Sequence, residues 1–177
     1  MRNGAERVTL RIRIVVADQT LELLDDQDAP IRRYSVSTAL NGVGEESGSY
    51  CTPRGSHIIR ARIGAGQPVN SVFVRRRPTG EIYTPELGAQ SPGRDWILTR
   101  ILWLSGCEPG RNRLGSVDTM RRYIYIHGSP DGAEMGVPGS KGCVRMQNED
   151  ILDLFDRVAT GIPVEIVEAI KSSPTTD

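Results

Sequence analysis

Residues 123–146 read YIYIHGSPDGAEMGVPGSKGCVRM and decide the fold expected for this chain. The apolar run Tyr123–Ile126 predicts a strand that ends at His127-Gly128. A loop rich in glycine and proline follows and leads to residues 140–145, SKGCVR. A helix is expected soon afterwards. The stretch therefore predicts a strand, a long loop and a helix in close succession.

The expected helix covers Asn148–Val158. Asn148 is a suitable N-cap, and the two acidic residues that follow it suit the positive end of the helix dipole. Apolar residues recur at helical spacing along one face. Gly161 and Pro163 end the helix.

Strand signals dominate the rest of the chain. Val8–Val16 alternates apolar residues with arginines, as a strand with one solvent-exposed face does, and it opens a hairpin or meander. Pro78–Gly93 contains three prolines and three glycines, which predicts a long irregular surface excursion, a kind of segment that is often a lid or binding loop. The other expected strands are Thr20–Leu24, Ile31–Ser37, His57–Ile63, Ser71–Arg75, Ile97–Leu104 and Val164–Val167.

These elements predict a mainly β protein, with mixed sheets in a sandwich-like arrangement and one or two helices. A length of 177 residues fits a single domain over 1–177, with a core at about 8–168 and a tail at 169–177.

The charge balance argues against two classes of partner. Charged residues make up 25% of the chain, yet the formal net charge is zero, so no long-range field favours nucleic acid or an anionic membrane surface. Lysine occurs only at positions 141 and 171, and the other basic residues are arginines. Arginine pairs well with carboxylates, so carboxylate-bearing partners fit, although a solvated arginine-rich surface fits equally.

The first residues, Met1–Arg13, lack the apolar segment and cleavage site of a signal peptide. Ile12–Ala17 is too short to span a membrane and is better explained as a strand. On this ground a cytoplasmic location, a trimmed precursor and an unrecognised export route all stay open.

Cysteines stand at positions 51, 107 and 143, and histidines at 57 and 127. No pair has zinc-ligand spacing, so a metal site is not expected. The cysteines allow either one disulfide, Cys51–Cys107 in an oxidising compartment, with a free thiol, or three thiols.

Cys143 and His127 lie sixteen positions apart, joined by a loop long enough to fold back. An imidazole can take the proton of a thiol and stabilise the thiolate, which makes a nucleophile. Gly142 permits a close approach of the chain, and N–H groups around Gly142 and Cys143 can face a developing oxyanion. The carbonyl of Gly128 is the expected acceptor for the other ring nitrogen of His127.

A plain structural explanation competes with this chemistry. A cysteine between small apolar residues is usually part of the core, and a histidine at a strand end is often only hydrogen-bonded there. Spacing alone favours that explanation.

The wider motif reverses the preference. His127-Gly128, then a loop, then Ser140-x-Gly142-Cys143-Val144-Arg145 resembles the signature of the L,D-transpeptidase catalytic domain (YkuD) family. Thr52-Pro53-x-Gly55 and the N-terminal strands are similar to earlier parts of that domain, so the resemblance covers roughly residues 8–168. It implies that Cys143 is the nucleophile and His127 its base.

The residues around Cys143 and His127 have several possible roles. Lys141 stands where many members carry a second histidine, and it either lowers the thiol pKa, meets a substrate carboxylate or is a solvated lysine. Arg145 is expected to hold the loop or bind a carboxylate, and Ser140 to stabilise the turn. Tyr125 is a candidate substrate contact, as are Trp96 and Trp103, although core packing explains all three. His57 is expected to be a structural histidine.

The resemblance implies acyl transfer on peptidoglycan stem peptides without a cofactor: Cys143 displaces a terminal D-Ala, and an acceptor amine forms a 3→3 cross-link. It also implies a periplasmic or cell-envelope location. Hydrolysis of the same acyl-enzyme would give an L,D-carboxypeptidase, and related enzymes attach other amines. A non-catalytic peptidoglycan-binding module is the alternative from a different class.

Overall fold

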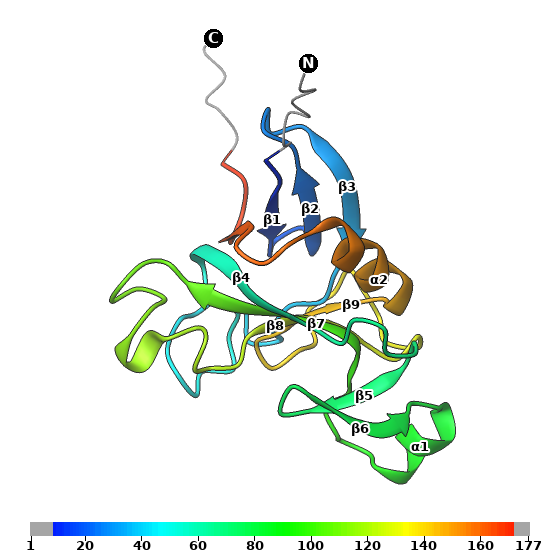
Figure 1. Cartoon of the computed structure of the whole chain (residues 1–177). Helices are drawn as coiled ribbons and strands as arrows, with labels where there is room; N and C mark the ends of the chain where they lie inside the picture. The colour runs from blue at the N-terminus through cyan, green and yellow to red at the C-terminus, as the bar shows by residue number, and fades with distance from the viewer. Residues whose placement is uncertain (1–8, 172–177) are drawn as a thin grey trace, which may run out of the picture.

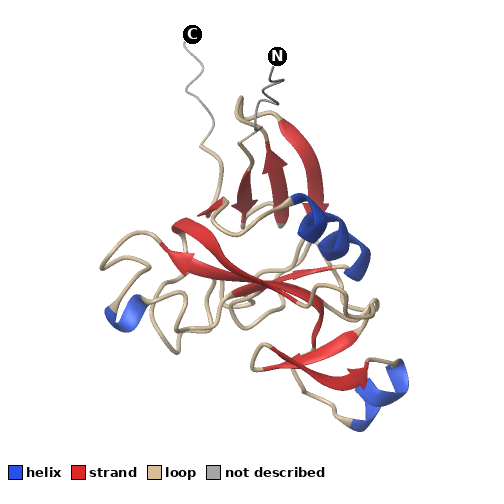
Figure 2. Cartoon of the chain, in the orientation of Figure 1, coloured by secondary structure: helices blue, strands red, loops and turns tan. Residues whose placement is uncertain are grey.

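One mixed sheet runs through residues 9–171, the part of the chain that the computed structural model describes. Strands dominate and helices are short, so the mainly β prediction is confirmed (Figure 2). The helices are α1 (Pro85–Gln90) and α2 (Asn148–Arg157), with a 3-10 turn at Gly115–Val117. The strands are β1 (Arg11–Val15), β2 (Thr20–Leu24), β3 (Pro30–Ser35), β4 (Gly55–Ile63), β5 (Ser71–Val74), β6 (Arg77–Ile82), β7 (Ile97–Gly106), β8 (Tyr125–Gly128), β9 (Val144–Met146) and β10 (Pro163–Val167).

The expected N-terminal meander is present. β1 pairs antiparallel with β2, β2 pairs antiparallel with β3, and β10 returns parallel to β1. Ile12 and Ile14 are fully buried, whereas Arg11 and Arg13, which alternate with them along the strand, are partly exposed. The alternation in the sequence therefore does place one face of β1 on the core.

The central strand β7 pairs with β4 and β5 along one edge and with β8 along the other, and β8 pairs parallel with β9. Because β4 also pairs with β10, the meander and the central strands belong to one continuous sheet, where separate sheets were expected. Figure 1 shows β1–β3 standing above the crossing strands β4, β7 and β8. Apolar side chains from both parts and from α2 form one core, which gives the sandwich-like packing.

The helix α2 packs on β7 and β8 and buries Ile151, Leu154 and Phe155. Its N-cap is Gln147, which makes no side-chain capping bond, so the assignment of Asn148 as N-cap is wrong. The side chain of Asn148 is instead buried, where it accepts from Thr99 Oγ1 at 2.6 Å. A tertiary partner outcompetes the local capping role.

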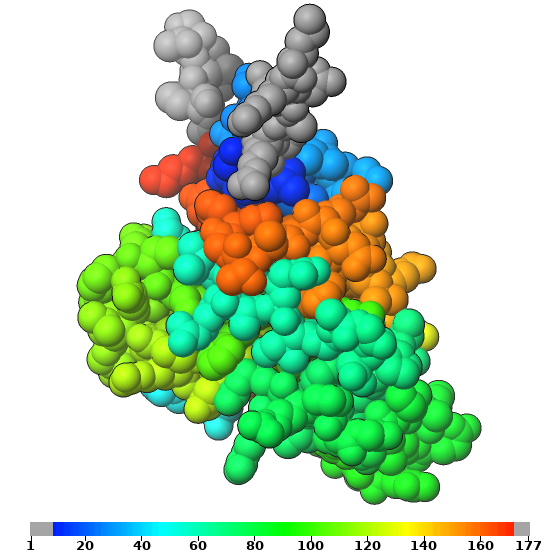
Figure 3. Space-filling model, in the orientation of Figure 1, coloured from blue at the N-terminus to red at the C-terminus, as the bar shows by residue number. Residues whose placement is uncertain are grey.

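The segment expected to be irregular, Pro78–Gly93, is largely regular. β6 contains Pro78 but lies at the end of the sheet, where a missing N–H is tolerated. Thr84 caps α1 by accepting from the N–H of Leu87 at 3.1 Å, and Pro85 occupies the first turn. With β5, these elements form a green lobe that projects from the molecule (Figures 1 and 3).

No helix within residues 9–171 is long and apolar enough to cross a membrane. Residues 1–8 and 172–177, which include most of the expected tail, lie outside the described residues.

Candidate active site

The parallel pair of β8 and β9 sends alternate side chains to opposite sides. Ile126 pairs with Val144, and both are fully buried in the core. Their neighbours along each strand therefore face the other way. There they line a cavity of about 470 Å³: Tyr125, His127, Cys143 and Arg145. The register thus brings the predicted nucleophile and base to one cavity.

The cavity is strongly basic. Its charged lining consists of five basic side chains and one acidic side chain: Arg75, Arg76, Arg122, Lys141, Arg145 and Asp95. This contrasts with the zero formal net charge of the whole chain. The local field therefore favours an anionic ligand.

The His127 side chain is fully buried, and its Nδ1 lies 2.6 Å from the carbonyl oxygen of Gly128, the acceptor that the sequence predicted. Because a carbonyl can only accept, Nδ1 carries the proton and Nε2 keeps its lone pair in the neutral ring. Nε2 has no hydrogen-bond partner within residues 9–171. Burial lowers the pKa of His127, so the ring is neutral at neutral pH and can act as a base.

Cys143 is half-buried. Its Sγ accepts from the N–H of Tyr125 at 3.3 Å and donates to the carbonyl of Tyr123 at 3.4 Å. Burial raises the pKa of the thiol to about 12, so it is protonated at neutral pH. The expected pairing of this thiol with the imidazole is absent in this conformation, because the thiol donates to the Tyr123 carbonyl and Nε2 of His127 has no hydrogen-bond partner within residues 9–171.

Ser140 stabilises the loop that contains Gly142 and Cys143, as the sequence suggested. Its hydroxyl donates to the carbonyl of Cys143 at 2.5 Å and accepts from the N–H of Gly142 at 3.2 Å. The N–H of Gly142 is therefore engaged within the loop. This differs from the expectation that it faces an oxyanion.

The Thr52-Pro53 turn supports the same loop from a distant part of the chain. Thr52 is fully buried, and its hydroxyl donates to the carbonyl of Gly142 at 2.9 Å while accepting from the N–H of Ala39 at 3.0 Å. Gly142 itself has φ of +130°, a conformation that residues with a Cβ rarely adopt. Turn and glycine together fix the peptide before Cys143.

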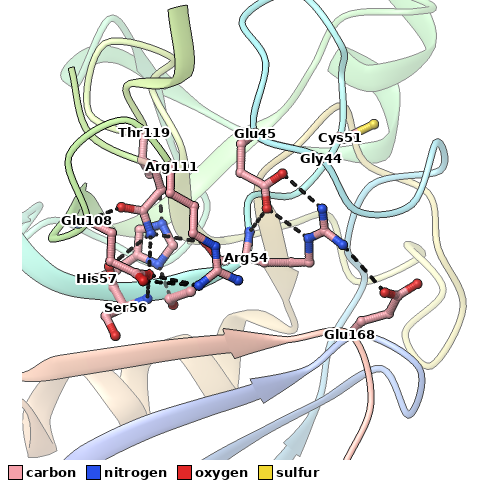
Figure 4. A network of polar contacts seen from close by, with 12 residues as sticks. Gly44, Glu45, Cys51, Arg54, Ser56, His57, Glu108, Arg111, Thr119 and Glu168 are labelled. Carbon is pink, nitrogen blue, oxygen red and sulfur yellow. Dashed lines mark hydrogen bonds and ion pairs between the residues drawn. The ribbon is translucent and has the colours of Figure 1, made fainter. Parts of the chain in front are cut away.

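A polar network holds the chain after that turn (Figure 4). Arg54 pairs with Glu45 at 2.8 Å, and His57 uses both ring nitrogens, towards the carbonyl of Gly55 and the hydroxyl of Thr119, each at 3.0 Å. Burial lowers the pKa of His57 to about 4, which keeps the ring neutral. His57 is therefore a satisfied structural histidine outside the cavity, as predicted.

The two other basic residues of the motif differ in their surroundings. The Arg145 guanidinium pairs with Asp95 and donates to the carbonyl of Gly139, both at 3.1 Å, which fits the loop-holding alternative. Lys141 lies exposed at the cavity. Its position fits either a contact with a substrate or a solvated side chain.

Three arginines of the cavity, Arg75, Arg76 and Arg122, were missed from the sequence. Arg76 donates to the hydroxyl of Tyr125 at 2.9 Å, and Arg122 donates to the carbonyl of Cys51 at 2.7 Å. Burial lowers the pKa of Arg122, whose guanidinium bridges the loop before the Thr-Pro turn. The runs Arg75-Arg76-Arg77 and Arg121-Arg122 were the available signals, but only the fold shows which members face the site.

The remaining candidate residues lie outside the cavity that contains Cys143 and His127. Cys51 and Cys107 are free thiols, so the disulfide considered for them is not formed. Trp96 packs edge-on against Tyr83 at 5.0 Å, and Trp103 packs near Tyr125, with ring centroids 6.2 Å apart. No group of metal-ligating side chains is found within residues 9–171.

Comparison with known proteins agrees with this geometry. The family model of the L,D-transpeptidase catalytic domain, YkuD, matches residues 9–166. The probable L,D-transpeptidase YbiS of Escherichia coli is 30% identical over 139 residues, which cover 72% of this chain and 44% of that protein. The putative L,D-transpeptidase YkuD of Bacillus subtilis is 30% identical over 94 residues, covering 53% and 47%. The chain thus spans about half the length of these relatives.

Solved structures share the fold at low identity. An L,D-transpeptidase from Mycobacterium smegmatis superimposes with a TM-score of 0.52 at 17% identity, covering 90% of this chain and 59% of that one. L,D-transpeptidase 3 from Mycobacterium tuberculosis, in complex with a faropenem-derived adduct, gives 0.54 at 15% identity, covering 90% and 60%. With the family model matched over nearly the whole described chain, this protein belongs to the L,D-transpeptidase catalytic domain family.

Proposed function

We propose that the chain is a cysteine acyltransferase that acts on peptidoglycan stem peptides, releases a terminal D-Ala and forms 3→3 cross-links. One observation carries the proposal: the half-buried thiol of Cys143 shares a basic cavity with the buried His127, whose unpartnered Nε2 is available as a base. Membership of the family supports the substrate class.

The first half-reaction begins at the neutral thiol. Its S–H turns from the Tyr123 carbonyl towards Nε2 of His127, which accepts the proton as Sγ attacks the carbonyl of the residue before the D-Ala. The N–H of Tyr125 already donates to Sγ and stabilises the developing thiolate. The C–N bond then breaks, the D-Ala nitrogen takes the proton from His127, and a thioester to Cys143 is left.

Oxyanion stabilisation in this step falls to the N–H of Cys143. The N–H of Gly142 is bound to Ser140, which leaves the neighbouring N–H as our candidate donor. Lys141 at the cavity rim supplies positive charge nearby.

The second half-reaction decides the type of enzyme. An amine of a second stem peptide attacks the thioester, loses a proton to His127 and releases the thiol with a new amide bond. Water in place of the amine would give a tripeptide and make the protein an L,D-carboxypeptidase. Cross-linking would take place in the cell envelope, whereas trimming of tetrapeptides is also compatible with the cytoplasm.

Trapping with a carbapenem tests the nucleophile. The wild-type protein is expected to gain the mass of the drug, and Cys143→Ala is expected to gain none. Cys107→Ala is the matched control, since Cys107 is an exposed free thiol away from the cavity and its loss should leave labelling unchanged. A folded wild-type protein that forms no adduct would contradict the proposal that the chain is an enzyme.

Incubation with a disaccharide-tetrapeptide, followed by mass analysis of the products, tests the substrate and the acceptor. A cross-linked dimer with release of D-Ala supports the transpeptidase. Tripeptide alone, even at high acceptor concentration, would establish the carboxypeptidase instead. Binding without any product would leave only a peptidoglycan-binding module.

A further inference from the structure

Arg76 lies at the tip of the β5–β6 hairpin and lines the cavity that contains Cys143. Its guanidinium carbon lies 4.6 Å from the centroid of the Trp103 ring and 4.7 Å from that of Tyr123. The same guanidinium donates to the hydroxyl of Tyr125 at 2.9 Å. Three aromatic side chains thus fix the position of this group beside the nucleophile.

This guanidinium is held in place yet has no anionic partner. Within residues 9–171, Arg76 makes no salt bridge, whereas Arg145 across the same cavity is paired with Asp95 at 3.1 Å. Arg122 satisfies its donors with backbone carbonyls, including that of Cys51. Arg76 uses one of its five N–H donors on Tyr125, so it keeps donors for a further acceptor.

The backbone at this point is costly to form. Arg75 and Arg76 are the two loop residues of the hairpin, and both have positive φ, +49° and +65°. Such turns favour asparagine and glycine because a Cβ is strained in that region. Arginine at both positions therefore fits a role for the side chains, since the turn itself is better made by other residues.

We propose that Arg76 binds a carboxylate of the acyl-donor peptide and so selects anionic donors. The planar fork of arginine matches a carboxylate through two parallel hydrogen bonds, and its aromatic neighbours prevent it from turning away. The identity of the donor rests on the proposed function. Arg76 shares the cavity with the nucleophile, so we restrict the ligand to the two carboxylates that flank the bond to be broken, that of the terminal D-Ala and that of the diamino acid side chain.

The test measures binding, so that it does not depend on catalysis. The chain of 177 residues carrying Cys143→Ala is titrated with a tetrapeptide and with two analogues, each carrying a carboxamide in place of one carboxylate. The same titrations are made after adding Arg76→Asn, which removes the charge and suits a positive φ. Arg77→Gln is the matched control, because Arg77 is an exposed arginine of the same hairpin that does not line the cavity.

One carboxamide analogue is expected to bind about ten-fold more weakly than the tetrapeptide, as for a lost charge-assisted hydrogen bond. Arg76→Asn should abolish this difference, and Arg77→Gln should keep it. Arg76→Lys, which keeps the charge without the fork, should restore only part of it. The analogue that loses affinity identifies the carboxylate.

The proposal is overturned if both analogues bind like the tetrapeptide, if none of the peptides binds, or if the difference survives in Arg76→Asn. These outcomes are separate from failure of the proposed function. A wild-type protein that binds the tetrapeptide with the expected preference but yields neither dimer nor tripeptide would remove the enzyme and keep the carboxylate site.

Discussion

The thiol of Cys143 and the imidazole of His127 are both neutral at neutral pH, because burial raises the pKa of the first and lowers that of the second. The resting cavity therefore contains a neutral thiol and a neutral imidazole, whereas some cysteine enzymes keep a thiolate beside an imidazolium. The Tyr125 N–H is positioned to stabilise the thiolate only as it forms. Attack and proton transfer must then be coupled.

This coupling predicts the pH dependence of acylation by a carbapenem. The rate needs neutral His127, whose pKa burial lowers from its usual 6.5, so it should be flat from about pH 7 to 9 and fall only at a pH below 6.5. In His127→Gln the base is gone, and thiolate must form unaided. Its rate should be low and rise about ten-fold per pH unit over the same range, because the thiol pKa is about 12.

Stopped-flow or mass-based acylation rates between pH 5 and 10 check both profiles. A wild-type rate that climbs steadily through pH 7 to 9 would contradict the assignment of His127 as base.

Gly142 offers a second test at a single position. A Cβ there would lie 3.0 Å from Ile124 Cδ1 and 3.2 Å from the carbonyl of Cys51, at φ of +130°. Gly142→Ala is expected to cost about 1–3 kcal/mol of unfolding free energy. The shift of the adjoining Cys143 should slow acylation about ten-fold or more. Chemical denaturation and adduct formation measure the two effects.

Gly136→Ala is the matched control. Gly136 has a positive φ of +85° in the same loop, but no atom lies within 4 Å of an added Cβ. It should lose some stability and keep the acylation rate. Equal acylation rates for the two variants would show that Gly142 does not position the nucleophile.

At the scale of the elements, regular patterns predicted most of the fold. Apolar residues alternate with arginines in β1 and form one face of α2, and these apolar residues are the ones that are buried. Each of these two elements could therefore be predicted from its own sequence. The combined motif, including Gly128 and Ser140, singled out Cys143 and His127 as candidates, and the structure places both in one cavity.

The remaining features depend on partners that lie far away in the sequence. β9 has only three residues and is a strand because β8 lies beside it. Asn148 has the sequence context of an N-cap, yet Thr99 binds its side chain. The sequence could not show that Arg75 and Arg76 line the cavity and Arg77 does not, nor that Arg76 alone of the three contacts Tyr125.

The meander contains a buried ion pair whose contribution to the free energy of unfolding can be measured. The Glu22 carboxylate on β2 is almost fully buried between Arg13 at 3.0 Å and Arg33 at 2.9 Å, and these arginines hold its pKa below the usual value. Glu22→Ala leaves Arg13 without its partner and should lower the unfolding free energy by about 3 kcal/mol. Denaturant titration near neutral pH measures the loss.

Glu165→Ala on the neighbouring strand β10 is the comparison. Glu165 pairs with Arg11 at 3.2 Å, but its side chain is 46% exposed, so its removal should cost less than about 1 kcal/mol. If both variants lose the same amount, burial does not determine the strength of these pairs.

At the scale of the whole molecule, the cavity is assembled from segments that are far apart in the chain. The β5–β6 hairpin, β8 and the loop before β9 all contribute to its lining, and each brings at least one basic or reactive side chain. The formal net charge of the chain is zero, so this positive cavity is a local feature of the fold. Electrostatic attraction of a donor should therefore act at short range.

Salt should reveal this local field. Raising ionic strength from about 0.05 to 0.5 M shortens the screening length to a few ångströms, so acylation by an anionic tetrapeptide at low concentration should slow about three-fold or more. Lys141, exposed at the cavity, should contribute to the effect, and Lys141→Gln should make the salt dependence shallower. Lys171→Gln removes the same charge from an exposed residue outside the cavity and should keep the wild-type slope. If Lys141→Gln and Lys171→Gln change the salt dependence of the acylation rate equally, the effect belongs to the whole molecule and not to the cavity. The same holds if a donor with amidated carboxylates shows the same salt dependence.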